Sequence, residues 1–216
     1  MIYLSGRWHN DLGEVPLGLV GYLRQPTGGG GPTSKAPKGT PWAADTGIYG
    51  STPFDLGTYL IFLERLQSQQ YCCLFATAPD VVADWEATLE RSMPVVPTIR
   101  AMGYRAALVL QDGATPETVP WQEIDAVFTG GSTAWKLSEN AYRLIAEAKR
   151  RGLWTHMGRV NSLRRLRAAA TAGYDSADGT HMAFRPTKYA MEVISWCVRL
   201  EAEPSMRLDA ALEAEV

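Results

Sequence analysis

Asp178 is the residue whose type and place in the sequence most directly suggest chemistry. It follows the short apolar run that begins at Tyr174, and a strand, an Arg-rich helix and a second strand are expected over residues 153–178. In parallel α/β proteins, side chains at the carboxyl ends of strands converge on a ligand. Asp178 is therefore a candidate catalytic residue. The alternative is that Asp175 and Asp178 only shape a turn.

Polar residues and a double glycine recur at the ends of the other apolar runs. In chain order they are Asp45, Asp80, Gln111, Gly130–Gly131, Met157–Gly158–Arg159 and Asp178. One such residue means little, because polar residues commonly follow strands. Their recurrence predicts a pocket that hydrogen-bonds a flat polar heterocycle, with glycines that let the backbone approach it closely.

The elements that position these residues are expected to alternate between strand and helix. Eight apolar runs predict strands: Ile2–Ser5, Leu17–Leu23, Trp42–Ala44, Cys72–Ala76, Ala107–Leu110, Ala126–Phe128, Trp154–Met157 and Tyr174–Ala177. Helices are expected over Phe54–Gln69 after the Thr52–Pro53 pair, and over Ser138–Arg151, Ser162–Ala172 and Pro186–Ala202. This alternation favours one compact (β/α)8 TIM-like barrel domain over residues 1–216, with a doubly wound open sheet as the alternative.

The stretch Pro26–Thr40 differs from the rest of the chain. It contains four consecutive glycines, Lys35 and Lys38, and no acidic residue. It is either a flexible surface loop or a mobile basic lid at the mouth of the site. No Gly-Lys-Ser/Thr follows the glycines, so they do not form a nucleotide-binding P-loop. Residues 204–216 are expected to be a frayed tail.

Composition excludes some function classes. The net charge of −2 and the pI near 5.9 argue against a strongly basic nucleic-acid binder, although a local basic face is allowed. Cys72, Cys73 and Cys197 have the spacing of neither a disulfide framework nor a zinc site. The chain begins without a signal peptide and has no run of membrane-spanning length. We therefore expect a cytoplasmic protein that binds no membrane.

Five motifs resemble those of the tRNA-guanine transglycosylases, and more closely their short phage-type relatives that act on DNA. They are Asp45–Tyr49, Val109–Gly113, Thr129–Gly131, His156–Gly158 and Gly173–Asp178, and the resemblance spans about Trp42 to Thr180. It implies that Asp178 is the nucleophile and Asp45 the general acid/base. It also implies base reading by Asp80, Gln111, Gly130, Gly131 and Gly158, and a stacking slot between Tyr49 and Met157.

The chain departs from the tRNA enzymes in two places. Only Cys197 follows Asp178, so the family's zinc subdomain is missing and no metal is expected. Lys136 stands where those enzymes have Glu, which leaves its role open. The shorter chain fits the DNA-acting branch, whose phage members would work in the host cytoplasm.

The implied activity is a pentosyltransferase reaction in which a free 7-deazaguanine base replaces guanine in DNA. Asp178 would form a covalent glycosyl intermediate and Asp45 would move the proton. The target nucleotide must be flipped out of the stack, and no cofactor is needed. A tRNA substrate, a hydrolase that only releases guanine, and a non-catalytic nucleotide-binding barrel remain alternatives. A homodimer or a partner protein is left open.

Basic residues near the predicted site could contact phosphates. The best placed are Arg159, Arg164 and Arg165, with Lys35 and Lys38 from the glycine-rich loop. The trio Lys149–Arg151 is instead expected to be the solvated end of a helix, where cations complement the helix dipole.

Overall fold

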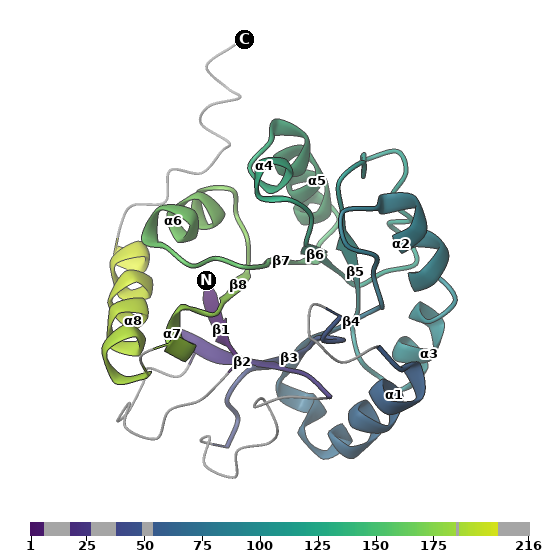
Figure 1. The fold of residues 1–216 in the computed structure, drawn as a ribbon, viewed down its shortest axis with the longest axis horizontal. Helices are drawn as coiled ribbons and strands as arrows, with labels where there is room; N and C mark the ends of the chain where they lie inside the picture. The colour runs from purple at the N-terminus through teal and green to yellow at the C-terminus, as the bar shows by residue number, and fades with distance from the viewer. Residues whose placement is uncertain (7–17, 27–37, 49–53, 185, 203–216) are drawn as a thin grey trace.

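The eight strands found in the described residues form a closed parallel barrel in chain order, β1 to β8, with the last strand paired to the first. Figure 1 shows helices outside this ring of strands. The structure is a computed structural model that describes residues 1–6, 18–26, 38–48, 54–184 and 186–202. The expected (β/α)8 TIM-like barrel is confirmed, and the pairing of β1 with β8 excludes the open sheet.

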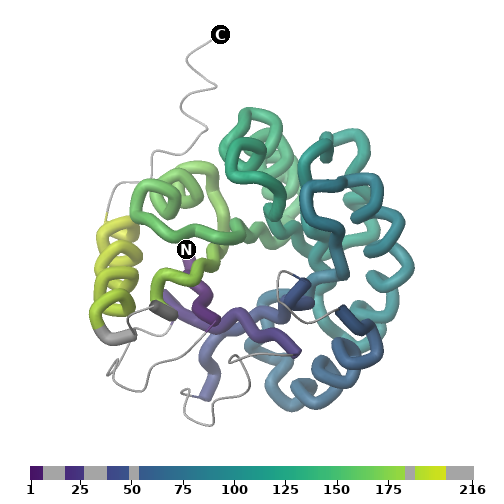
Figure 2. The backbone as a smooth tube through the Cα atoms, viewed as in Figure 1, coloured from purple at the N-terminus to yellow at the C-terminus, as the bar shows by residue number. Residues whose placement is uncertain are grey.

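The strands are short. They are β1 Ile2–Ser5, β2 Val20–Arg24, β3 Trp42–Ala44, β4 Cys73–Thr77, β5 Ala106–Leu110, β6 Ala126–Thr129, β7 Trp154–Met157 and β8 Ser176–Gly179. β1, β3 and β7 have the predicted bounds. β8 begins two residues later than expected, and Asp178 lies within it. In Figure 2 the ring closes where the N-terminal segment lies beside β8.

The helices connect successive strands or follow the last one. They are α1 Leu56–Arg65, the 3-10 helix η2 Gln67–Cys72, α2 Trp85–Ser92, α3 Val96–Ala101, α4 Thr133–Lys136, α5 Glu139–Arg150, α6 Leu163–Thr171, α7 His181–Phe184 and α8 Pro186–Ala202. α5 and α6 each begin one residue later than expected, because Ser138 and Ser162 cap them, and glycines with positive φ follow both. α8 has its predicted bounds.

The predicted start of the first helix is wrong. α1 begins at Leu56 and not at Phe54, because the Asp55 side chain caps it by accepting a hydrogen bond from the backbone N–H of Thr58 at 2.7 Å. Thr52 and Pro53 lie outside the described residues. α2 and α3 were not predicted at all. They fill the connection between β4 and β5, where apolar residues are spaced too irregularly to show a clear helical stripe.

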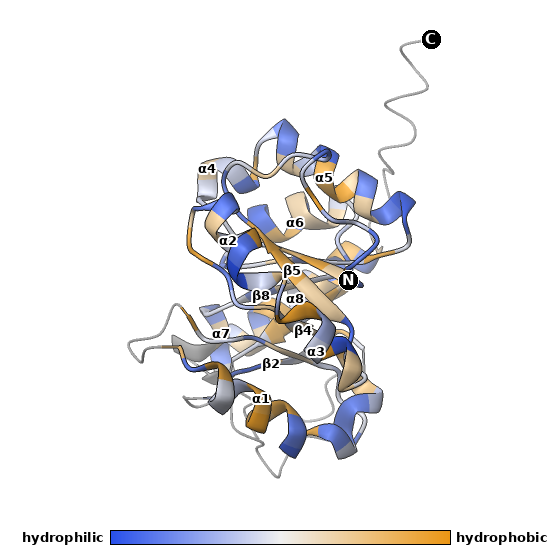
Figure 3. Ribbon diagram, turned by 90° about the vertical axis from the view of Figure 1, so that its right-hand side faces the viewer, coloured by the Kyte–Doolittle hydropathy of each residue, from blue (hydrophilic) through white to orange (hydrophobic). Residues whose placement is uncertain are grey.

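The core has two layers, because successive residues of a strand point to opposite faces. Inside the barrel lie Leu4, Leu23, Ala43, Phe75, Ala107 and Ala126. A larger cluster fills the space between strands and helices. In Figure 3, strand β5 at the centre is mainly orange, and the outer helices carry blue segments. The alternation decides which strand residues reach the barrel axis.

No helix in the described ranges is long and apolar enough to cross a membrane. The three cysteines are free thiols, with Cys197 buried in the outer core. Most of the glycine-rich loop, residues 27–37, and the tail from residue 203 lie outside the described residues.

Candidate active site

Asp178 lies on the inner face of β8, next to Leu4 of β1 in the strand register. Its side chain is 13% exposed, so it is shielded but reachable. The Oδ1 atom lies 2.9 Å from Nε2 of His156 and 3.4 Å from the backbone nitrogen of Arg159. These contacts hold one carboxylate oxygen in place. Asp175 has a different role, because it bonds Thr155 and Lys149 before β8 begins.

His156 is the main site residue that sequence reasoning did not single out. It is fully buried on β7, and its ring centroid lies 4.5 Å from that of Phe128 and 5.0 Å from that of Phe75. Its Nδ1 lies 2.8 Å from the Ser176 hydroxyl oxygen. Two-residue periodicity could have found it, because His156 stands two positions before Gly158 and pairs in register with Ser176.

Asp45 follows β3 at the same end of the barrel. Gln25 donates a hydrogen bond from Nε2 to Asp45 Oδ2 at 2.6 Å. Burial raises the pKa of Asp45 to about 6, and the negative charges of Asp178 and Asp80 act in the same direction. Asp45 can therefore hold and release a proton near neutral pH.

Asp80 and Gln111 form a buried polar group with the loop after β6. Gln111 donates from Nε2 to Asp80 Oδ2 at 2.6 Å, and its Oε1 accepts from the backbone N–H groups of Ala83 and Gly131, at 2.9 and 2.8 Å. Burial raises the pKa of Asp80. The side-chain oxygen of Gln111 and the backbone N–H of Gly131 are thus hydrogen-bonded to each other in this structure. Contact of either residue with a ligand stays a prediction.

The glycines at strand ends make room for side chains inside the barrel. A Cβ atom at Gly158 would lie 2.6 Å from the Phe128 ring, and one at Gly130 would lie 2.8 Å from Gln111 Nε2. Such contacts are too close for any other residue without movement. In this structure the missing side chains of the two glycines leave room for Phe128 and Gln111. Contact of their backbone with a base remains a prediction.

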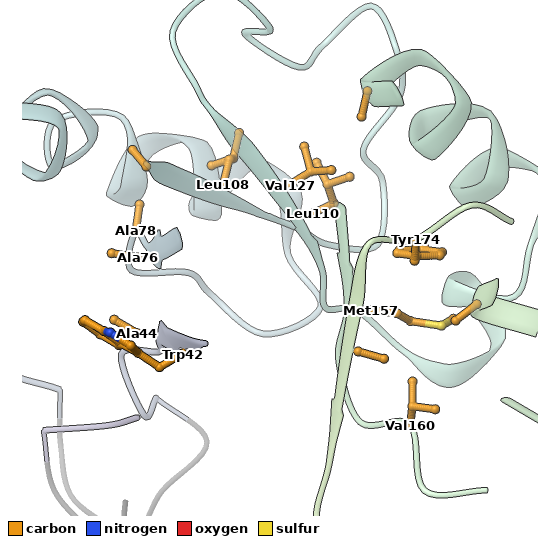
Figure 4. Close-up of a cluster of buried hydrophobic side chains, with 14 of the residues drawn as sticks. Trp42, Ala44, Ala76, Ala78, Leu108, Leu110, Val127, Met157, Val160 and Tyr174 are labelled. Carbon is orange, nitrogen blue, oxygen red and sulfur yellow. The ribbon is translucent and has the colours of Figure 1, made fainter. Parts of the chain in front are cut away.

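The expected stacking position of Met157 is not what the structure shows. Met157 is buried in the outer core, in the cluster that also contains Tyr174 and Val160 (Figure 4). The reason is strand alternation, since His156 points inward on β7 and its neighbour must point outward. Tyr49, the other expected stacking residue, lies outside the described residues.

Positive charge gathers beside Asp178. Lys136 is 3% exposed and donates from Nζ to the Gly158 carbonyl oxygen at 2.7 Å. Burial, with a smaller contribution from the charge of Arg159, lowers the pKa of Lys136 to about 8, and the charge of Asp178 acts in the opposite direction. Arg159 has the left-handed backbone φ of 60°, and its guanidinium donates to the Gly131 carbonyl oxygen. Arg159 therefore ties the ends of β6 and β7 together.

Of the other predicted phosphate contacts, Arg164 and Arg165 stand at the start of α6, which follows the carboxyl end of β7. With Leu137, Asn161 and Ser162 they line a surface hollow. Lys38 is exposed but lies at the opposite end, since the adjacent Gly39 shares a hollow with the amino ends of β4 and β5. Lys38 is therefore not at the mouth of the site, which corrects the expectation. Lys35 lies outside the described residues.

The trio Lys149–Arg151 lies at the end of helix α5, as expected, and its side chains are paired with carboxylates. Lys149 bonds Asp175 at 2.6 Å, and Arg150 and Arg151 both pair with Glu147. This helix end precedes β7, so it also lies at the amino end of the barrel.

In the described part of the chain, no group of three His, Cys, Asp or Glu side chains is arranged to hold a metal ion. No protein-family model matches the sequence, and no curated protein matches it. Among solved structures, one described as "Native KDPGal structure" matches with a TM-score of 0.52 and 10% identity, over 94% of this chain and 93% of that chain. At this identity the similarity shows the fold alone.

Proposed function

We propose that this protein is a pentosyltransferase that replaces guanine in DNA by a 7-deazaguanine base. One observation carries the proposal: two carboxylates stand at the same end of the barrel in contrasting surroundings. Asp178 accepts hydrogen bonds beside the cation of Lys136, whereas burial raises the pKa of Asp45 to about 6. Contrasting environments of this kind let one carboxylate act as an ion and the other as an acid.

In the first step, a carboxylate oxygen of Asp178 attacks C1′ and the bond between C1′ and the guanine nitrogen breaks. The departing guanine takes the proton of Asp45, so that no free anion leaves. In the second step, the ring nitrogen of the 7-deazaguanine attacks C1′, returns its proton to Asp45 and releases Asp178. Two displacements restore the original configuration at C1′, as in retaining glycosidases.

The polymer must present a single nucleotide to the barrel end. A carboxylate inside a barrel cannot reach C1′ in a stacked duplex, so the nucleotide is flipped out or taken from a single strand. Arg164 and Arg165 at the start of α6 are suited to contact the flanking phosphates. The Asp80 carboxylate, which is buried at the same end, is an acceptor for N–H groups of the base.

Base exchange is tested with an isotopically labelled 7-deazaguanine, offered with guanine-containing DNA or tRNA. We expect label to enter DNA with the wild-type protein and not with Asp178→Asn, which keeps the volume but removes the anionic nucleophile. Asp84→Asn is the matched control, because Asp84 is an exposed helix cap and Asn caps equally well. Its exchange should equal that of the wild type.

Other outcomes separate the alternatives. Label in tRNA alone would replace DNA by tRNA as the substrate. Release of guanine without uptake of label would indicate a hydrolase. Neither release nor uptake, from a folded protein, would contradict catalysis and leave a nucleotide-binding barrel.

A further inference from the structure

We propose that His156 is a positioning residue for Asp178, held as the neutral tautomer that carries its proton on Nε2, and that Trp154 and Ser176 select this tautomer. The tautomer follows from hydrogen bonds alone. The catalytic consequence rests on the proposed function.

The argument begins at Trp154 on β7, whose indole Nε1–H can only donate. It donates to the Ser176 hydroxyl oxygen at 2.9 Å. That oxygen therefore acts as an acceptor toward Trp154, and its own hydrogen must be used elsewhere. The remaining partner of the Ser176 hydroxyl among the described residues is His156 Nδ1, at 2.8 Å.

The hydroxyl of Ser176 accordingly donates to His156 Nδ1, which must be the unprotonated nitrogen. A neutral imidazole with a bare Nδ1 carries its proton on Nε2. Nε2 lies 2.9 Å from Asp178 Oδ1, so the N–H points at the carboxylate. The opposite tautomer would turn two acceptors toward each other there, and would leave the buried Ser176 hydrogen without an acceptor.

The packing around this chain of bonds keeps it fixed. Trp154 and His156, two positions apart, both lie on the inner face of β7. Ser176 and Asp178 both lie on the inner face of β8, and the register pairs His156 with Ser176. His156 and Ser176 are fully buried, and Phe75 and Phe128 lie against the imidazole. No solvent-exposed edge of the imidazole is left for water to replace a partner.

The arrangement also identifies the attacking atom. Oδ1 of Asp178 accepts from His156 and faces the backbone nitrogen of Arg159. Within the described residues, Oδ2 has no hydrogen-bond partner. Oδ2 is therefore the atom free to attack C1′, and His156 orients it without giving up its proton.

Nitrogen-15 NMR on protein labelled at histidine tests the tautomer directly and needs no activity. The His156 signals are assigned by their loss in His156→Gln. We expect a bare Nδ1 and a protonated Nε2 at pH 7 in the wild type. A proton on Nδ1, or on both nitrogens, would overturn the proposal whether or not the protein exchanges bases.

A matched pair of variants tests the positioning role. His156→Asn can keep a group near Ser176 but cannot reach Asp178, whereas His156→Gln can place an amide N–H near the position of Nε2. We expect His156→Asn to slow formation of the covalent adduct about 100-fold with little change in KM, and His156→Gln to restore at least tenfold of that loss. Equal rates in both variants, with thermal unfolding matching the wild type, would contradict positioning. An inactive wild type would contradict the proposed function, and the NMR result would still decide the tautomer.

Discussion

Asp45 and Asp178 have the same side chain in contrasting surroundings, and the proposed function assigns them different tasks. Burial keeps Asp45 protonated to higher pH, against the opposing effect of the hydrogen bond from Gln25, while Asp178 meets N–H donors and feels the positive charge of Lys136. If Asp45 is the acid, adduct formation needs its protonated form.

The pH dependence of adduct formation tests this assignment. Because the pKa of Asp45 is raised to about 6, its protonated fraction falls about tenfold for each pH unit above that value. We expect the single-turnover rate of the wild type to fall about tenfold between pH 7 and 8. Asp45→Asn should be slow and should lack this decline. A wild-type rate that rises over this range would rule out Asp45 as the acid.

A second prediction concerns how the buried Lys136 changes the free energy of unfolding with pH. Its folded-state pKa of about 8 lies below the ordinary 10.5, so the unfolded chain binds the proton more tightly. The cost of burying the charge is present below about pH 8 and disappears as pH rises toward 10.5. Relative to Lys136→Met, the wild-type free energy of unfolding should therefore increase by up to about 3 kcal/mol over this window. Urea unfolding at several pH values measures it, and parallel curves for the two proteins would refute it.

Sequence reasoning located the carboxylates better than it located their partners. Asp45, Asp80 and Asp178 could be found because each ends a short apolar run, a local signal. Lys136 meets the Gly158 carbonyl oxygen, and its charge acts on Asp178, only after the strands are arranged in space. Met157 was wrongly predicted to line the pocket. Because its neighbour His156 points into the barrel, Met157 must point to the outer core.

At the scale of elements, strand positions were predictable because turn residues bound each apolar run and the strands alternate with helices. Pro41 directly precedes β3 and Gly158 directly follows β7, and residues of these two types commonly mark strand ends. The start of α1 was less predictable because Thr52 and Asp55 are both good cap residues, three positions apart, and it is Asp55 that accepts from the backbone N–H of Thr58.

The contact between β1 and β8 gives a prediction at this scale. A Cβ at Gly179 would lie 2.3 Å from both the Tyr3 hydroxyl oxygen and the Val160 carbonyl oxygen. Gly179→Ala should therefore destabilise the barrel by several kcal/mol, about the size of severe core substitutions. Gly6→Ala is the control, because an added Cβ there meets nothing within 4 Å. Thermal melts measure both, and equal melting temperatures would contradict the close packing.

At the scale of the whole molecule, the two ends of the barrel carry different basic residues. Arg164 and Arg165 stand at the carboxyl end with the candidate site, whereas Arg150 at the amino end is paired with Glu147. The net charge of −2 hides this asymmetry. If nucleic acid binds at the candidate site, its affinity must depend on the arginines at the carboxyl end of the barrel and not on those at the amino end.

A salt series measures this dependence. Arg164→Gln should weaken DNA binding and reduce the log-log salt slope by about 0.7 to 0.9, the contribution of one phosphate contact. Arg150→Gln should change neither quantity. Anisotropy titrations with single-stranded DNA, duplex DNA and tRNA provide the comparison. Equal losses in both variants would show that binding is nonspecific, and a preference for tRNA would favour the tRNA alternative.

The pairing of β1 with β8 also constrains how the protein matures during synthesis. β1 leaves the ribosome well before residues 176–179, its partner on one side, have been made. Until then both edges of the growing sheet stay unpaired. Because Asp178 lies on the strand that closes the ring, the candidate site of a nascent chain is incomplete before closure. The proposed base exchange and resistance of the barrel to proteases should therefore appear together, after β8 has been made.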